Sequence, residues 1–231
     1  RKKIQKNCFL WSPCNDYGAY LADKYNSKNF KKRINDFNYI HDKFLQFRRL
    51  NSNSLFENKI SKNKLYLKKK RFGSGSRGIS FYKERKPLKS QNYFIQEYLK
   101  GIELSLETLS FNSKHRLLNI SYRILKNYKS ACIIYSKNFK PIINKFFEKE
   151  IIKILNKLKI KNGVCHIEVI LTDSKKLFPI DLNIRTGGAG VSDQLLPYVL
   201  KSDVNKFDFE ILSNKIKSHN LIKLKRNFNL A

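Results

Sequence analysis

The sequence contains no methionine, one tryptophan, four cysteines, five prolines and nine glycines among 231 residues. It begins with Arg1, and this start, together with the lack of methionine, predicts that the N-terminus of a longer protein is missing. No run approaches the roughly 18 consecutive apolar residues that a membrane-spanning helix needs, and the basic start leads only into the short apolar stretch CFLW. We therefore expect a cytoplasmic protein with no membrane partner.

The cysteines are too scattered to indicate a metal site. Cys8, Cys14, Cys132 and Cys165 form no C-x-x-C pair, and none is spaced from a histidine as zinc ligands are. This pattern favours reduced, structural thiols over a zinc site.

Acidic residues are also scarce, since 18 Asp and Glu stand against 48 Lys and Arg, which gives a formal charge of +30 and a pI of about 10.0. Clustered cations would indicate nucleic-acid binding, because they release counterions from phosphates. Here lysine is spread over the whole length, and the excess of Lys, Asn, Ile, Phe and Tyr resembles a coding bias towards AT-rich codons. The charge therefore predicts no specific nucleic-acid partner.

The hydrophobic pattern predicts mixed helices and strands around a core supplied by the 41% of apolar residues. Helical spacing covers 17 to 50, recurs from Pro141 to about Lys159, and returns at the end of the chain. Strand patterns cover 65–69, 93–99, 103–111, 117–125, 131–135, 164–171 and 176–184. We expect the strand at 103–111 to be half-buried, because its leucines alternate with polar residues. Adjacent strands favour an α+β fold with antiparallel sheet over a doubly wound fold.

A glycine-rich loop follows the first strand pattern. Gly73, Gly75 and Gly78 match G-x-G-x-x-G, which predicts phosphate binding because glycine lets backbone N–H groups turn towards an anion. The pattern also occurs in dinucleotide folds, in protein kinases and in flexible surface loops. The kinase motifs HRD and DFG are absent, and KKKRF stands where a dinucleotide fold needs an apolar strand, although Glu97 has the spacing of a ribose-binding acid.

The segment 163–190 predicts an antiparallel hairpin with one chemical face. If Leu171 opposes Phe178, then Glu168 lies directly across from Asp181. Side chains two apart share a face of a strand. The polar face therefore holds His166, Glu168, Asp181, Asn183 and Arg185, and the apolar face holds Ile167, Val169, Leu171, Ile180 and Leu182. Two carboxylates and an amide oxygen are ligands suited to Mg²⁺ held together with phosphates, whereas zinc would favour His or Cys. The alternative is an exposed polar hairpin face.

The run YLKKKRFGSGSRGI (66–79) resembles the strand, lysine and glycine loop of ATP-grasp enzymes such as the carbamoyl phosphate synthetase large subunit and biotin carboxylase. The resemblance implies that Lys69 touches nucleotide phosphates and that Lys43, in a D-K pair, does the same through charge-assisted hydrogen bonds. The loop residues that would contact ATP are Gly73, Ser74, Gly75, Ser76 and Gly78. Family members usually have proline where this chain has Lys70.

The segment FIQEYLKGIELSLE (94–107) resembles the adenine hinge and G-x-E element of the same family. This resemblance implies that Glu97, Tyr98 and Leu99 border the adenine. Glu103 would accept hydrogen bonds from the ribose hydroxyls, since an ionised carboxylate only accepts. The alternative is that Glu103 and Glu107 line the solvent face of a strand.

In the hairpin, the resemblance implies that Glu168, Asp181 and Asn183 bind two Mg²⁺ ions bridging the ATP phosphates, with Mn²⁺ able to replace them. Asp181 stands where the family usually has Glu. Asn183 and Arg185 would be catalytic, and the guanidinium of Arg185 would hold a carboxylate or the transferring phosphoryl group in a bidentate fork. The glycines after it would let the acceptor substrate approach backbone amides.

The implied fold is ATP-grasp, with two α+β subdomains whose mostly antiparallel sheets grip ATP between them. We expect 1–40 to be the remnant of a preceding α/β domain and 41–231 to be the ATP-grasp domain. Within that domain, about 60–100 would form a small lid subdomain and about 101–231 a larger metal-binding subdomain.

The implied activity is an ATP-dependent carboxylate–amine ligase that forms an acyl phosphate from a small-molecule carboxylate or bicarbonate and passes it to an amine. Homodimer formation is left open. A catalytically degenerate ATP-binding protein is the alternative, because 119–140 has no glycine although relatives often carry a glycine-containing catalytic loop there. A basic nucleic-acid-binding module fits less well, because it does not require an ordered set of acids.

Overall fold

The computed structural model describes residues 8–13, 15–30, 35, 37–50, 61, 63–73, 75–84, 88, 90–126, 129–135, 145–188, 190–213 and 215. These residues form helices and two antiparallel sheets, so the predicted α+β class is confirmed. No helix among them is long and apolar enough to cross a membrane. Among these residues Cys132 and Cys165 are free, and Cys165 is buried.

The smaller sheet has three strands in the order β2-β1-β3. Its strands are β1 (Tyr66–Lys70), β2 (Ser80–Tyr82) and β3 (Tyr93–Glu97), and β1 pairs antiparallel with both others. The strands predicted at 65–69 and 93–99 are thus present, the second of them two residues shorter than expected. The glycine-rich loop joins β1 to β2, and it needs glycine at Gly75 and Gly78, whose φ angles are 64° and 81°.

The larger sheet has five strands in the order β6-β5-β4-β7-β8, with every neighbouring pair antiparallel. They are β4 (Ile102–Phe111), β5 (Lys114–Lys126), β6 (Lys129–Ile134), β7 (Gly163–Leu171) and β8 (Leu177–Asn183). The prediction that 103–111 is half-buried was wrong, since residues 104–110 are all buried. β4 is the central strand, and other elements cover both of its faces, so its polar side chains are buried along with its leucines.

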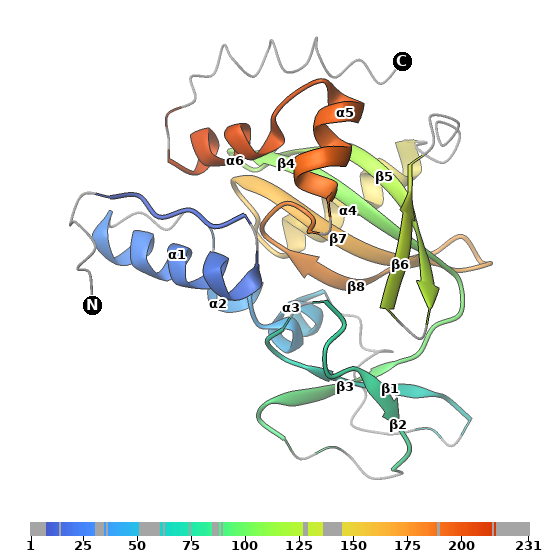
Figure 1. The fold of residues 1–231 in the computed structure, drawn as a ribbon. Coiled ribbons are helices and arrows are strands. Elements are labelled where there is room, and N and C mark those ends of the chain that lie inside the picture. The colour runs from blue at the N-terminus through green and yellow to red at the C-terminus, as the bar shows by residue number, and fades with distance from the viewer. Residues whose placement is uncertain are drawn as a thin grey trace.

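The helices surround the larger sheet. They are α1 (Asp16–Asn29), α2 (Phe37–Ile40), α3 (Lys43–Arg49), α4 (Lys145–Lys157), a π-helix η3 (Val191–Leu195), α5 (Leu196–Leu200) and α6 (Val204–Leu212). The single helical region predicted at 17–50 is therefore three helices. Pro141, the predicted start of the long helix, lies outside the described residues. Figure 1 shows α3 between the two sheets and α5 and α6 beyond the larger sheet, on the side away from the smaller one.

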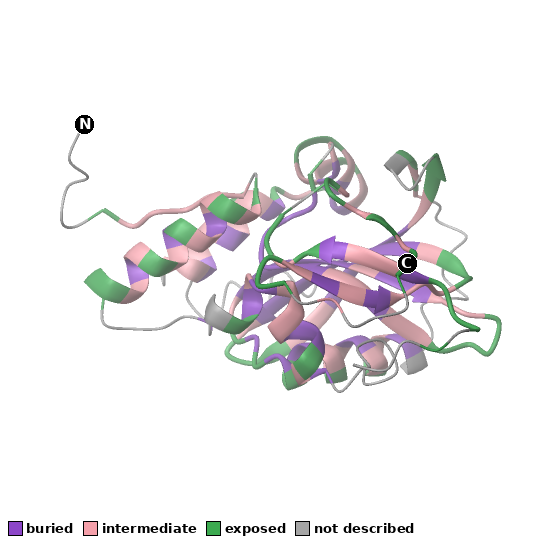
Figure 2. Cartoon of the chain, turned by 90° about the horizontal axis from the view of Figure 1, so that it is seen from below, coloured by how far each residue is buried: buried purple, intermediate pink, exposed green. Residues whose placement is uncertain are grey.

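The two faces of the larger sheet have different partners. On one face, α4 buries Ile151, Leu155 and Leu158 in a core with alternate residues of the strands, including Leu104, Leu106, Ile167, Val169 and Leu182. At one end of the opposite face, Val191, Leu196 and Val204 pack on Leu109 and Val164. The burial pattern in Figure 2 follows this layering, with buried residues concentrated in the strands and exposed residues in the connections. The rest of the second face is polar and points towards the smaller sheet.

Gly101, which joins β3 to β4, shows how closely the backbone packs at the edge of that polar face. A Cβ atom there would lie 2.4 Å from the carbonyl oxygen of Leu171 and 2.6 Å from Cγ2 of Ile170. Only glycine fits without moving the end of β7.

We therefore expect Gly101→Ala to lower the free energy of unfolding by about 1 to 3 kcal/mol, the usual cost of overpacking. Gly188→Ala is the matched control, because no heavy atom lies within 4 Å of a Cβ at that position. Chemical denaturation of both variants measures the difference. Equal stability of the two variants would show that the contact at Gly101 relaxes freely.

Candidate functional site

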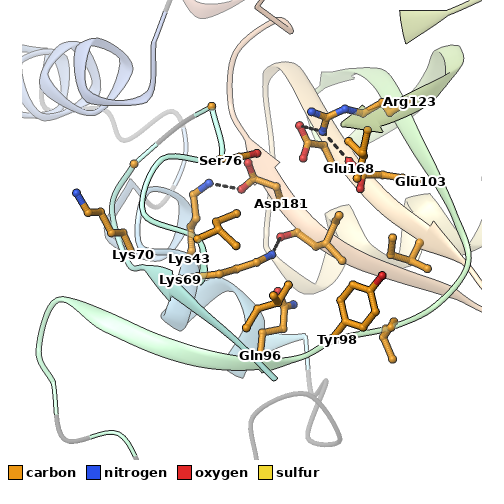
Figure 3. A pocket seen from close by; sticks show the side chains of 18 of the residues that line it. Lys43, Lys69, Lys70, Ser76, Gln96, Tyr98, Glu103, Arg123, Glu168 and Asp181 are labelled. Atoms are coloured by element: carbon orange, nitrogen blue, oxygen red, sulfur yellow. Dashed lines mark hydrogen bonds and ion pairs between the residues drawn. The ribbon is translucent and has the colours of Figure 1, made fainter. Parts of the chain in front are cut away.

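A cleft of about 960 Å³, including the solvent at its mouth, opens between the polar face of the larger sheet and the smaller sheet. Figure 3 shows side chains from both sheets and from α3 pointing into it. Most of the residues predicted to form the site line this cleft, namely Lys43, Lys69, Gly73, Gly75, Ser76, Glu97, Tyr98, Leu99, Glu103, Glu168 and Asp181. Gly78, Asn183 and Arg185 are not among its lining residues, and Ser74 lies outside the described residues.

The hairpin of β7 and β8 pairs Glu168 with Asp181, as predicted, and His166 with Asn183. Ile167 also pairs with Leu182 in the predicted register, but beyond Glu168 the predicted register was wrong, because Leu171 pairs with Leu177 and Phe178 pairs with Ile170. A bulge between Glu168 and Val169 shifts the pairing and leaves Ile180 as the extra residue on β8.

Because of the bulge, the predicted position of Ile180 was also wrong. We expected it on the apolar face, but it lines the cleft, and its carbonyl oxygen accepts a hydrogen bond from Nζ of Lys69 at 3.1 Å. The bulge frees this carbonyl group from the strand ladder. It thus gives the buried lysine its hydrogen-bond acceptor.

Lys69 is a buried cation on β1, with 7% of its surface exposed. Burial lowers its pKa to about 8, although nearby Asp181 works in the opposite direction. An ammonium group in this position is only partly compensated by the protein. It would gain most from an anionic ligand in the cleft.

Lys43 occupies the first position of α3, and its ammonium group forms an ion pair with Asp181. Burial works to lower the pKa of Lys43, but Asp181 outweighs it, so the pKa is raised. Asp42 caps the helix by accepting from the backbone N–H of Phe44 at 3.0 Å, and it also accepts from Nε of Arg71 at 3.1 Å. In the D-K pair, Asp42 therefore caps α3 and contacts Arg71 at the start of the glycine-rich loop, whereas Lys43 lines the cleft.

A row of alternating charges crosses the polar face of the sheet. Nη1 of Arg123 lies 3.0 Å from Oε1 of Glu103 and also forms an ion pair with Glu168. Glu168 lies 3.3 Å from Nε2 of His166, and Nδ1 of His166 lies 2.5 Å from Glu107. Glu107 is only 1% exposed, so the alternative of a solvent-facing strand is wrong for it.

This row sets the pKa values of its members. Burial raises the pKa of Glu103 to about 7, and Arg123 only partly offsets that rise. For His166, burial works to lower the pKa, but Glu107 outweighs it and raises the pKa to about 10. Burial would raise the pKa of Glu168, yet His166 and Arg123 hold it well below the usual range. Glu168 is therefore an ionised oxygen donor.

Arg185 lies beyond the end of β8, outside the cleft lining and 7% exposed. Nε and Nη2 each lie 2.5 Å from Oδ1 of Asp16, and Nη1 donates to the carbonyl oxygen of Thr186 at 2.8 Å. Asn183 donates through Nδ2 to Oδ2 of Asp181 at 3.2 Å. Asp16 was not predicted, because 169 residues separate it from its partner.

Gln96 is a second residue that the sequence did not indicate. It lines the cleft and is 1% exposed, and neither polar atom of its side chain has a hydrogen-bond partner in the described part of the chain. Buried amides are normally satisfied. An unpaired donor and acceptor at a cleft wall therefore indicate a polar ligand.

The oxygen donors Glu168, Asp181 and Asn183 have the chemistry that Mg²⁺ requires. Among the described residues, no three His, Cys, Asp or Glu side chains are close enough to hold a metal ion by themselves. Mg²⁺ usually binds through one or two carboxylates and takes its other ligands from substrate phosphates and water. The residues therefore fit a metal that arrives with a phosphate ligand.

The chain was compared with known protein families and with curated proteins. The family described as "ATP-grasp domain" matches residues 40–189, which is more than half of the chain. No curated protein matches the chain.

Solved structures with the same fold include the following three enzymes. The L-amino acid ligase from Bacillus licheniformis is 14% identical with a TM-score of 0.65, over 88% of this chain and 55% of that one. The biotin carboxylase domain of Hydrogenobacter thermophilus 2-oxoglutarate carboxylase, in complex with MgADP, ADP and bicarbonate, is 12% identical with a TM-score of 0.58, over 84% and 51%. The carboxyaminoimidazole ribonucleotide synthase from Aspergillus clavatus, complexed with ATP, is 10% identical with a TM-score of 0.60, over 87% and 59%.

This chain thus spans little more than half the length of these structures. At such low identity, the likeness shows the fold alone.

The charge row itself can be tested without a ligand. We expect Arg123→Met to lower the free energy of unfolding by about 3 kcal/mol at neutral pH, because Glu103 and Glu168 are partly buried and His166 alone would then remain beside Glu168. Lys126→Met on the same strand is the control, since Lys126 is exposed. Thermal and urea unfolding compare the two variants. A loss no larger than that of the control would show that Arg123 is dispensable to the fold.

Proposed function

This chain belongs to the ATP-grasp domain family, and we propose that it is a Mg-ATP-dependent ligase joining a small-molecule carboxylate to an amine through an acyl phosphate. The observation that carries the proposal is a single cleft that brings together two lysines, a glycine-rich loop and two opposed acids. The substrates of the proposed reaction are small molecules, and no nucleic acid takes part.

The adenine end of the cleft is assigned to β3 and the segment after it. Glu97, Tyr98 and Leu99 line it, and Gln96 offers an unpaired donor and acceptor suited to the edge of a base. Glu103 is assigned to the ribose hydroxyls. Its contact with Arg123 is made by Oε1, which leaves Oε2 to accept from a sugar.

The phosphate end is assigned to Lys69, Lys43 and the loop that carries Gly73, Gly75 and Ser76. Lys69 supports this assignment, since its ammonium is buried beside a single carbonyl acceptor. We assign the small lid subdomain to the three-stranded sheet, whose loop lines the cleft on the side opposite to β7 and β8.

Glu168, Asp181 and Asn183 would hold the metal, Mg²⁺ or its substitute Mn²⁺. When bound, the ion would neutralise charge on the phosphates and polarise the γ-phosphorus. In the protein itself, Lys43 pairs with Asp181 and Arg123 pairs with Glu168, so a cation positions each carboxylate.

The reaction follows from these groups without a side-chain nucleophile. An oxygen of the substrate carboxylate attacks the γ-phosphorus, the bond to the β,γ-bridging oxygen breaks, and ADP leaves with the bonding electrons. The amine nitrogen then attacks the acyl carbon and loses a proton, and the C–O bond to phosphate breaks. Arg185 is assigned to the carboxylate and to the acyl phosphate, while positioning and charge neutralisation supply the rate.

We expect Asp181→Asn to reduce carboxylate-dependent ADP release by about 100-fold or more, because the site loses a charged ligand where phosphoryl charge develops. Asparagine is preferred to alanine, since Lys43 would otherwise lose its partner. Asp173→Asn, in the exposed turn of the same hairpin, is the matched control. A coupled assay over panels of carboxylates and amines measures both. Parent-like rates in Asp181→Asn would remove the hairpin from the mechanism.

A second expectation concerns Lys69, whose pKa of about 8 makes its charge sensitive to mild alkali. Because ATP prefers the protonated amine, its affinity should fall as pH rises above 8, by about tenfold per pH unit at the limit. Lys69→Arg should flatten this dependence, since arginine stays protonated. Calorimetry between pH 7 and pH 9.5 provides the measurement, with NAD as a second ligand. Binding of NAD in place of ATP would favour the dinucleotide alternative.

A further inference from the structure

The ion pair between Asp16 and Arg185 is unusually one-sided. Both Nε and Nη2 of Arg185 lie 2.5 Å from the same oxygen, Oδ1 of Asp16. The other oxygen, Oδ2, is buried and has no hydrogen-bond partner among the described residues. A buried carboxylate oxygen without a donor costs free energy. It is therefore a place where a ligand's donor would bind.

Arg185 has N–H groups beside Asp16 that form no hydrogen bond with the described residues. A guanidinium carries five N–H groups, and within the described chain three of them are engaged, two by Asp16 and one by the carbonyl oxygen of Thr186 at 2.8 Å. One N–H on each terminal nitrogen is left for an acceptor. The pair thus offers a cationic donor and an anionic acceptor side by side.

The pair also lies close to the reaction centre. Asp16 is within electrostatic reach of both Asp181 and Lys43, which shift its pKa in opposite directions. These are the residues assigned to the metal and the phosphates. A molecule held by the pair would therefore lie near the residues assigned to the metal and the phosphates.

We propose that Asp16 and Arg185 recognise the two charges of one zwitterionic substrate, so that the carboxylate substrate of this protein is an amino acid. Arg185 receives the carboxylate that becomes the acyl phosphate, and Oδ2 of Asp16 accepts from the ammonium group. The inference rests on the proposed ligase function, because it names the substrate class of that site. A carboxylic acid without the ammonium group would leave Oδ2 of Asp16 unpaired.

A purely structural role makes a different prediction. Asp16 stands in the first turn of α1, and its pair with Arg185 also fastens that helix to the end of β8. If this were its whole contribution, removing the charge would lower stability and would affect all carboxylates equally. Selectivity between substrates distinguishes the two roles.

The experiment compares amino acids with analogues that lack only the amino group: phenylalanine with 3-phenylpropionate, leucine with 4-methylpentanoate, and alanine with propionate. Mg-ATP supplies the phosphate and hydroxylamine serves as the amine, so that acyl phosphate is trapped as a hydroxamate. We expect the parent protein to favour at least one amino acid over its analogue by about tenfold or more in kcat/KM, through KM, as befits a charged hydrogen bond.

Two variants complete the test. Asp16→Asn should remove that preference, so that kcat/KM becomes equal for an amino acid and its analogue, whereas Asp23→Asn should keep the preference. Asp23 is the matched control, because it lies on the same helix and pairs with His41 at 3.0 Å. The comparison within the parent protein needs no variant, so it decides the question even if Asp16→Asn does not fold.

Equal use of amino acids and analogues by the parent would overturn the inference and leave the ligase function standing. So would a loss in Asp16→Asn that is the same for both classes. If no carboxylate in the panel yields hydroxamate or ADP, the proposed function itself fails, and the inference fails with it.

Discussion

Two carboxylates, Glu168 and Asp181, face each other across the hairpin of β7 and β8, and the rest of the site is arranged around their charge. Like charges this close and partly buried are stable only with cations beside them. Lys43 supplies one from α3 and Arg123 supplies the other from β5. The pairing therefore connects a helix, a hairpin and a distant strand, and it holds both carboxylates in place for a metal.

The larger sheet can accommodate these partly buried charges because one of its faces is apolar and the other is polar. In β4, β7 and β8, alternate side chains pack in the core against α4, and the side chains between them lie on the polar face. The helices α5 and α6 close one end of that face, so charge is concentrated at the open end. Buried charge is thus confined to the region where a charged ligand would compensate it.

Much of this layout could be predicted from the sequence, because strand alternation and a short turn are local signals. The opposition of Glu168 and Asp181 followed from them, as did the strand before the glycine-rich loop, whereas β2 after the loop was not predicted. The bulge that turns Ile180 into the cleft could not be predicted, because the alternation of polar and apolar residues does not indicate where an extra residue is inserted in a strand. Arg123, Gln96 and Asp16 were missed for another reason. Arg123 and Asp16 matter through contacts with residues far away in the chain, and Gln96 matters because it is buried at the cleft without a partner, and none of this is visible in the neighbouring sequence.

The central claim, that a carboxylate is activated by phosphorylation in this cleft, is tested most directly by the fate of its oxygen. A substrate carboxylate that supports turnover is labelled with ¹⁸O, and the released phosphate is examined by mass spectrometry. Attack on the γ-phosphorus followed by acyl transfer predicts that each phosphate carries one oxygen from the carboxylate. Phosphate that carries oxygen from water alone would mean that water attacks ATP directly, and it would contradict the ligase mechanism.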